Sequence, residues 1–70
     1  MFARRLRQAN HTRDYLIAPA GREGWEVRLE EDRTLTRLEH YRDWHRVERA
    51  LASFEREVEE LTARGWHITR

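Results

Sequence analysis

The chain has 70 residues, of which 14 are basic and 13 acidic, so its formal net charge is only +1. A chain of this length can form one small domain whose core contributes only a few kcal/mol, and it has no room for a second domain. The balanced charge provides no overall field that would favour nucleic acid or an anionic membrane. The absence of cysteine excludes a disulfide framework and a thiolate metal site, and it favours a reducing compartment.

Apolar runs in the chain are short. The longest, Tyr15 to Ala20, has six residues, whereas about 20 are needed to cross a bilayer. We therefore expect a cytoplasmic protein that does not bind a membrane.

Residues 1 to 13 are basic and contain no acidic residue. We predict a basic N-terminal arm that precedes a single small domain of residues 14 to 70. Short basic arms lie along phosphates or in a minor groove. The predicted phosphate contacts are Arg4, Arg5, Arg7 and Arg13.

A second interpretation of this segment stays open. Phe2, Leu6 and Ala9 follow one another at steps of four and three. That spacing favours a helical turn or two docked on the domain, with the arginines in solvent.

Three strands are predicted from Asp14 onwards. The first covers Tyr15 to Ala18, and a loop with one proline and two glycines separates it from the second, Trp25 to Glu30, whose apolar and charged residues alternate strictly. The third covers roughly residues 34 to 41. Its facing is ambiguous because Leu35 and Tyr41 favour one face and Leu38 the other, a conflict that a β-bulge would resolve.

A long helix follows the third strand. From Trp44 the apolar residues recur at alternating steps of three and four, and the segment as far as Arg64 is rich in helix-forming residues. Asp43 is suited to the N-cap and Gly65 to the position after the C-cap. This pattern predicts one amphipathic helix that packs on the sheet.

The density of polar residues around His40 and His45 suggests a metal or catalytic site, but the spacing does not support one. The two histidines are five residues apart, so on one helix they would point in different directions. Ser53 has no histidine one helical turn away to activate it. We therefore expect no metal, no cofactor and no enzymatic activity.

Geometry suggests a partner interface at the end of the chain. A helix of this length spans about 31 Å and strands of five to eight residues span about 17–26 Å, so the helix should extend beyond its sheet. A C-terminal strand, the N-terminal segment or a second copy of the helix could cover the excess. The predicted interface residues are Val58, Leu61, Trp66 and Ile68.

These observations predict an α+β fold: a three-stranded antiparallel sheet, with a short fourth strand at the C-terminus as an option, packed against one long C-terminal helix. The predicted function is a non-catalytic interaction module that binds a second copy of itself, as a homodimer, or another protein. The alternative is a nucleic-acid-binding accessory protein that uses the arginine-rich arm.

Overall fold

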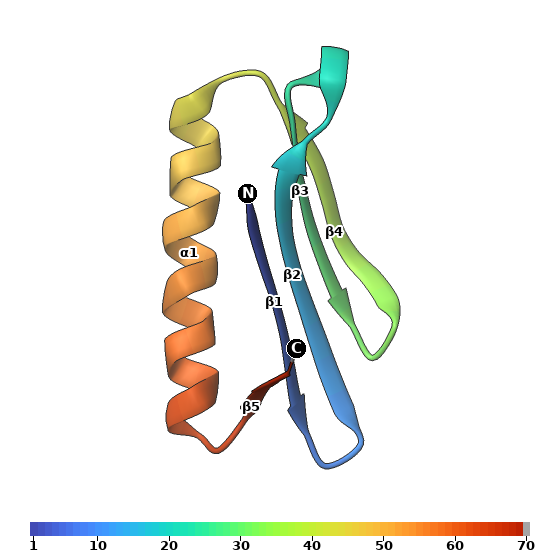
Figure 1. The fold of residues 1–70 in the computed structure, drawn as a ribbon, viewed down its shortest axis with the longest axis vertical. Helices are drawn as coiled ribbons and strands as arrows, with labels where there is room; N and C mark the ends of the chain where they lie inside the picture. The colour runs from blue at the N-terminus through green and yellow to red at the C-terminus, as the bar shows by residue number, and fades with distance from the viewer. Residues whose placement is uncertain (70) are drawn as a thin grey trace.

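The computed structural model describes residues 1 to 69 and shows one helix packed on one face of a five-stranded antiparallel sheet (Figure 1). The strand order is β4-β3-β2-β1-β5, so the first four strands form a meander and the helix returns the chain to the β1 edge. Arg70, the last residue of the predicted domain, lies outside the described residues. The elements are β1 (Phe2–Gln8), β2 (His11–Pro19), the 3-10 turn η1 (Gly21–Glu23), β3 (Trp25–Glu31), β4 (Thr34–Tyr41), α1 (Trp44–Ala63) and β5 (His67–Thr69).

The sheet has five strands, not the three or four that the sequence predicted, and the unexpected strand is β1. Instead of an arm or a helical turn, this segment pairs with β2 along its whole length. The alternation of apolar and polar residues that predicts a strand is interrupted at Arg4, which occupies an inward position between Phe2 and Leu6. Its guanidinium lies 4.7 Å from the centroid of the Phe2 ring, so the aliphatic part of the side chain covers apolar surface while the charge reaches solvent.

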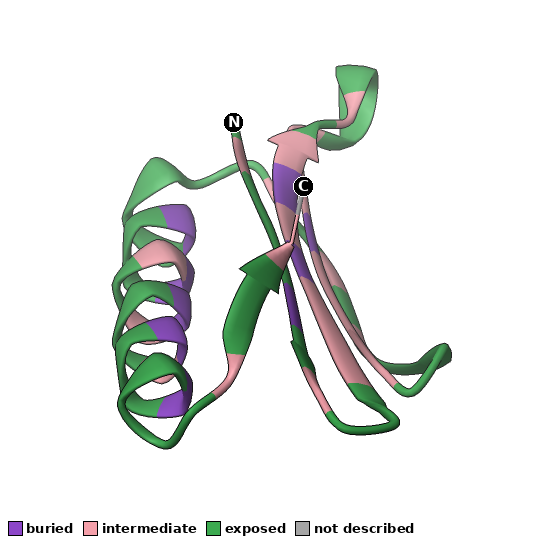
Figure 2. Ribbon diagram, turned by 60° about the horizontal axis from the view of Figure 1, so that its bottom comes forward, coloured by how far each residue is buried: buried purple, intermediate pink, exposed green. Residues whose placement is uncertain are grey.

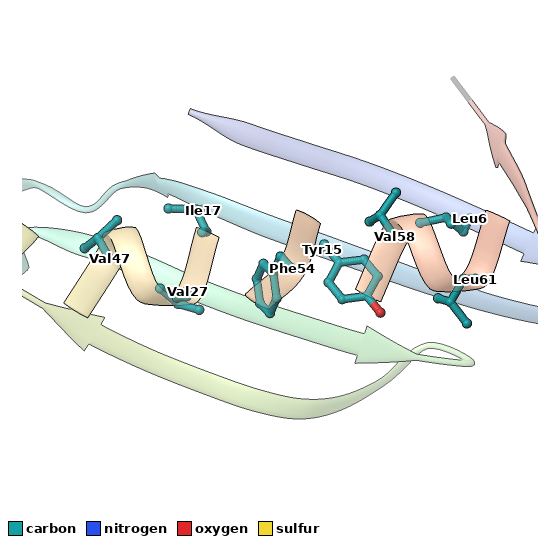
Figure 3. Close-up of a cluster of buried hydrophobic side chains, with 9 residues drawn as sticks. Leu6, Tyr15, Ile17, Val27, Val47, Phe54, Val58 and Leu61 are labelled. Atoms are coloured by element: carbon teal, nitrogen blue, oxygen red, sulfur yellow. The ribbon is translucent and has the colours of Figure 1, made fainter. Parts of the chain in front are cut away.

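The core lies between α1 and the inner face of the sheet (Figure 3). Phe54 is at its centre, and the centroid of its ring lies 4.9 Å from that of Tyr15 in an edge-to-face arrangement. The predicted inward face of the second strand is confirmed, because Val27 is buried and its neighbours pack against the core. The buried residues are Leu6, Tyr15, Ile17, Val27, Val47, Ala50, Phe54, Val58 and Leu61.

Strand register separates the sheet into an inner and an outer face. Residues directly opposite each other in adjacent antiparallel strands point to the same side. One row of opposed residues faces outwards: Ala3, Leu16, Arg28 and Leu38. Within the described chain no helix covers this outer face, and Figure 2 shows the buried residues of α1 on the side that faces the sheet.

A bulge in β4 resolves the facing of the third predicted strand. Leu29 lies opposite Arg37 and Glu30 lies opposite Leu35, so Thr36 is the extra residue. The Thr36 hydroxyl donates a hydrogen bond to the Leu29 carbonyl at 3.2 Å. Leu35 therefore joins Leu38 on the outer face, while Tyr41 points inwards against the core.

Both predicted ends of the helix are confirmed. The Asp43 carboxylate accepts a hydrogen bond from the His45 N–H at 3.0 Å, which caps the first turn. At the other end Gly65 has a φ of +98°, and the Trp66 N–H donates to the Leu61 carbonyl at 3.0 Å. Over residues 1 to 69, no helix is at once long and apolar enough to span a membrane.

Replacing Phe54 by alanine should lower the free energy of unfolding by about 3–5 kcal/mol, because the substitution removes a fully buried ring and leaves a cavity. Arg56→Ala, at an exposed position of the same helix, should change it by no more than about 0.5 kcal/mol. Denaturant unfolding of the two variants measures the difference. Equal effects would contradict the position of the core.

Gly24 and Gly21 provide a second matched pair, because both have positive φ angles but only Gly24 is enclosed. A Cβ at Gly24 would lie 2.4 Å from the Tyr41 carbonyl oxygen, whereas nothing lies within 4 Å of one at Gly21. Gly21→Ala should cost about 1 kcal/mol from backbone strain alone. Gly24→Ala should cost at least about twice as much, because the end of β4 must move. Thermal unfolding that ranks them in the opposite order would exclude this close packing.

Candidate functional site

The four predicted interface residues do not form one surface. Val58 and Leu61 are buried in the core, because β1 covers the part of α1 that was expected to extend beyond the sheet. Trp66 is half-buried, and the Arg13 guanidinium lies 5.5 Å from the centroid of its ring. Ile68 is 51% exposed on β5. The structure therefore assigns the two helix residues to the interior and leaves Ile68 alone at the surface.

The four predicted phosphate contacts are also dispersed. Arg4 and Arg13 are on the inner face of the sheet, whereas Arg5 and Arg7 are on the outer face. Two of them form ion pairs, Arg5 with Asp14 at 2.5 Å and Arg13 with Glu31 at 3.2 Å. The other two donate hydrogen bonds to nearby backbone carbonyl groups, those of Ala3 and Ala9. The segment therefore presents divided and partly neutralised charge.

The histidine-rich stretch at the start of α1 does not converge on one point. The His40 Nε2 atom lies 3.2 Å from a Glu23 carboxylate oxygen and 3.3 Å from one of Glu26, whereas His45 lies in the first turn of α1. Residues 1 to 69 contain no group of three or more side chains that could hold a metal ion. This stretch serves to join β4 to the helix.

The β4 edge has the properties of an interaction site. β4 is the last strand on its side of the sheet and pairs only with β3, so one side of this eight-residue strand has no strand partner among the described residues (Figure 1). Backbone N–H and C=O groups along such an edge can pair with another strand. The edge carries neither proline nor lysine, but the bulge at Thr36 interrupts it, so regular pairing is confined to the part of the strand around Leu38.

Charged and polar side chains of β4 form a connected group on the inner face. The Arg37 guanidinium pairs with the Glu39 carboxylate, which also accepts a hydrogen bond from the Tyr41 hydroxyl. The hydrogen bonds from Tyr41 and Arg37 lower the pKa of Glu39 below its ordinary value. The Arg37 guanidinium also lies 5.6 Å from the centroid of the Phe54 ring, which fixes the group against the core. A positive and a negative side chain are therefore held in place along the open edge.

Apolar side chains of β4 are on the outer face. Leu35 is 49% exposed and Leu38 is 45% exposed. Beside them Arg28 lies between Glu26 and Glu30, at 3.0 and 3.8 Å from their carboxylate oxygens. These ion pairs keep the neighbouring part of the outer face charged and polar, so the two leucines form the apolar part of the edge.

A depression of about 440 Å³ is on the outer face and is lined mainly by charged residues. Arg5 and Asp14 pair across it, as do Arg28 and Glu30. Most of this charge is paired, although the buried Arg28 Nε has no hydrogen-bond partner among residues 1 to 69. The β4 edge is the stronger candidate.

Comparisons of the chain with protein-family models, curated proteins and solved structures give no match. The function is therefore argued from the residues of this chain.

The low pKa of Glu39 predicts a pH dependence. A carboxyl group whose pKa is lower in the folded state stabilises the fold above its unfolded-state pKa, and this contribution is lost as the pH falls through the folded-state value. The difference in unfolding free energy between the native chain and Glu39→Gln should therefore shrink when the pH falls from about 7 to about 2. In a Tyr41→Phe background, which removes the largest cause of the shift, the same difference should change less with pH. Equal pH dependence in both backgrounds would rule out the hydrogen bond as its cause.

Proposed function

We propose that the protein is a non-catalytic self-association module in which two copies pair edge to edge along β4. The observation that carries the proposal is the open eight-residue edge with fixed charges of opposite sign around an exposed leucine. Antiparallel pairing of β4 with β4 of a second copy would extend the sheet across a two-fold axis. Such isologous contacts are the commonest form of soluble oligomer.

Charge selects the register of this pairing. With Leu38 opposite Leu38 of the second copy, Arg37 lies opposite Glu39 of that copy, and the reciprocal pair forms by symmetry. If the two-fold axis instead passes beside Arg37 or beside Glu39, that residue lies opposite the same residue of the second copy, so two identical charges face each other. Like charges directly opposite in a sheet are destabilising. The register centred on Leu38 is therefore favoured over its neighbours.

The leucines add apolar burial to the backbone hydrogen bonds. Leu38 is directly opposite its counterpart in this register, and both are on the outer face with Leu35 beside them. Burying apolar area contributes about 25 cal/mol per Å². Because Leu35 and Leu38 are about half exposed in the single chain, they have area left to bury.

The non-catalytic part of the proposal has separate support. Ser53, the one serine of the chain, forms no hydrogen bond with a histidine among residues 1 to 69. Its surroundings between α1 and β4 are arginines and apolar groups, with Glu39 already bound to Arg37 and Tyr41. A nucleophile needs an adjacent base to activate it. We place the module in the cytoplasm, where a chain without cysteine is at no disadvantage.

The nucleic-acid alternative has weaker support. Its four arginines are on two faces of the sheet and two of them are already paired with carboxylates. Phosphate affinity depends on cations that are free to replace counterions. Self-association through β4 also uses charges that are paired within the chain, Arg37 with Glu39, but its affinity comes from backbone hydrogen bonds and leucine burial rather than from free cations.

Reversing either charge of β4 should weaken self-association. In Arg37→Glu two acidic side chains face each other at each of the two symmetric contacts, and in Glu39→Arg two basic ones do. Each variant should raise the dissociation constant about tenfold or more, because each contact changes from favourable to unfavourable. Sedimentation equilibrium over a range of protein concentrations measures the constant.

Mixing the two variants is the decisive control. One copy then presents two glutamates and the other two arginines, so all pairs across the axis are again of opposite sign and a heterodimer should form with close to the native affinity. Thermal unfolding of each variant alone checks that the fold survives the loss of the Arg37–Glu39 pair. A native chain that stays monomeric, or variants that do not combine on mixing, would refute the proposal.

A further inference from the structure

A second surface, on the side of the sheet opposite β4, has a different chemistry. A groove of about 230 Å³ lies between the first half of α1 and the start of β1. Its apolar lining includes Phe2, Trp25, Trp44 and Leu51. Trp44 is 47% exposed, and the centroid of its ring lies 5.1 Å from that of Trp25. Exposed aromatic side chains that line a groove are typical of binding sites.

The strand beside this groove has an open backbone. β5 pairs only with Arg5, Leu6 and Arg7, so residues 2 to 4 of β1 have no strand neighbour on that side among the described residues. The Thr69 hydroxyl donates to the Arg5 carbonyl at 3.3 Å, which shows that this carbonyl points towards β5. Because backbone groups of alternate residues point to the same side of a strand, Ala3 presents its N–H and C=O to the open position.

The backbone carbonyl of Ala3 is only weakly engaged in hydrogen bonding within the described chain. Among residues 1 to 69, it accepts a hydrogen bond only from the neighbouring Arg4 side chain, at 2.8 Å on the exposed surface. A side chain held this loosely can be displaced by a strand that offers its own backbone N–H. The Ala3 backbone, which has no strand neighbour on this side among residues 1 to 69, can therefore accept a short extended segment.

The wall of the groove formed by α1 is acidic. Glu55 lines the groove, and Glu48 and Glu59 lie on the same flank of the helix at spacings of seven and four residues. All three are exposed, and none of them forms an ion pair within residues 1 to 69. Among residues 1 to 69, Arg4 is the one basic residue that lines the groove. The charge of this wall therefore attracts cations.

We propose that this groove binds an extended segment of a partner protein that carries basic and apolar side chains. The segment pairs with the backbone of Ala3, places an apolar side chain against Trp44 and Leu51, and directs its basic side chains to the glutamates of α1. This mode combines backbone pairing at a sheet edge with side-chain pockets. It goes beyond the self-association proposed for β4, because the two surfaces are on opposite edges of the sheet.

The test uses a synthetic peptide, acetyl-Arg-Thr-Ile-Thr-Arg-amide, whose basic and apolar residues point to one side when it is extended. Its matched control replaces both arginines with glutamate. Titration of the isotope-labelled protein with the basic peptide should give saturable shifts that cluster at residues 2 to 4, at the Trp44 indole N–H and at Leu51. The acidic peptide should give none at these positions.

Charge reversal in the groove provides the second arm. In a variant with Glu48→Lys and Glu55→Lys, the dissociation constant for the basic peptide should rise at least about tenfold. The same variant should bind the acidic peptide. Glu60→Lys with Glu59 intact, which places a positive charge on the other flank of α1, should retain the native preference. Equal shifts with both peptides, or shifts outside the groove, would overturn the proposal.

Binding of the basic peptide in the groove should not depend on self-association through the β4 edge. An Arg37→Glu chain, whose self-association is expected to be weakened, should bind the basic peptide as the native chain does. If that variant binds the peptide while the native chain proves monomeric, the groove proposal stands and the β4 proposal fails. If the chain dimerises through β4 but the peptide causes no shifts in the groove, the groove proposal fails and the β4 proposal stands.

Discussion

One helix cannot cover a five-stranded sheet, and this constraint together with the strand order determines which surfaces of the protein remain open. An α-helix is about 10 Å wide with its side chains, whereas five strands about 4.8 Å apart extend across roughly 20 Å. α1 therefore covers the middle of the inner face, with Phe54 packed on Tyr15. The outer strands on both sides are left incompletely covered. On one side this exposes β4, and on the other it exposes the beginning of β1 beside the helix.

The two open edges are protected in different ways. The outer face between them is kept charged and polar by ion pairs such as those of Arg28 with its flanking glutamates. At β1 a single side chain, Arg4, reaches the free carbonyl, and β5 covers only the other half of the strand. At β4 the backbone of the edge has no strand partner among residues 1 to 69. The positions of Arg37 and Glu39 favour pairing with a second copy in the register centred on Leu38 over registers displaced by one residue. Electrostatics thus contributes register and specificity, while backbone hydrogen bonds and leucine burial contribute the affinity.

The sequence predicted the helix, its caps and the central strands well, because these depend on local patterns. Asp43, Gly65 and the alternation around Val27 are each interpretable from neighbouring residues alone. β1 escaped prediction because Arg4 stands at an inward position, which is tolerated because its side chain lies over the Phe2 ring and its charge reaches solvent. Because β1 was not predicted, Val58 and Leu61 were expected at a partner interface, whereas in the structure both are buried in the core together with Leu6 of β1. The conflicting facing of the apolar residues between 34 and 41 was the one feature of the sequence that indicated something unusual in β4. That β4 lies at the edge of the sheet depends on strand order, which no local pattern of residues reveals.

The central claim, that β4 pairs with β4 of a second copy about Leu38, is tested most directly by intermolecular nuclear Overhauser effects in a mixture of labelled and unlabelled chains. The account predicts contacts between the Leu38 side chains of the two copies and between backbone protons of Arg37 and Glu39 across the axis. It also predicts no contacts between the two α1 helices at their buried residues. Intermolecular contacts centred on Ile68 or on α1 would contradict the claim. A monomer at the concentration of the measurement would contradict it equally.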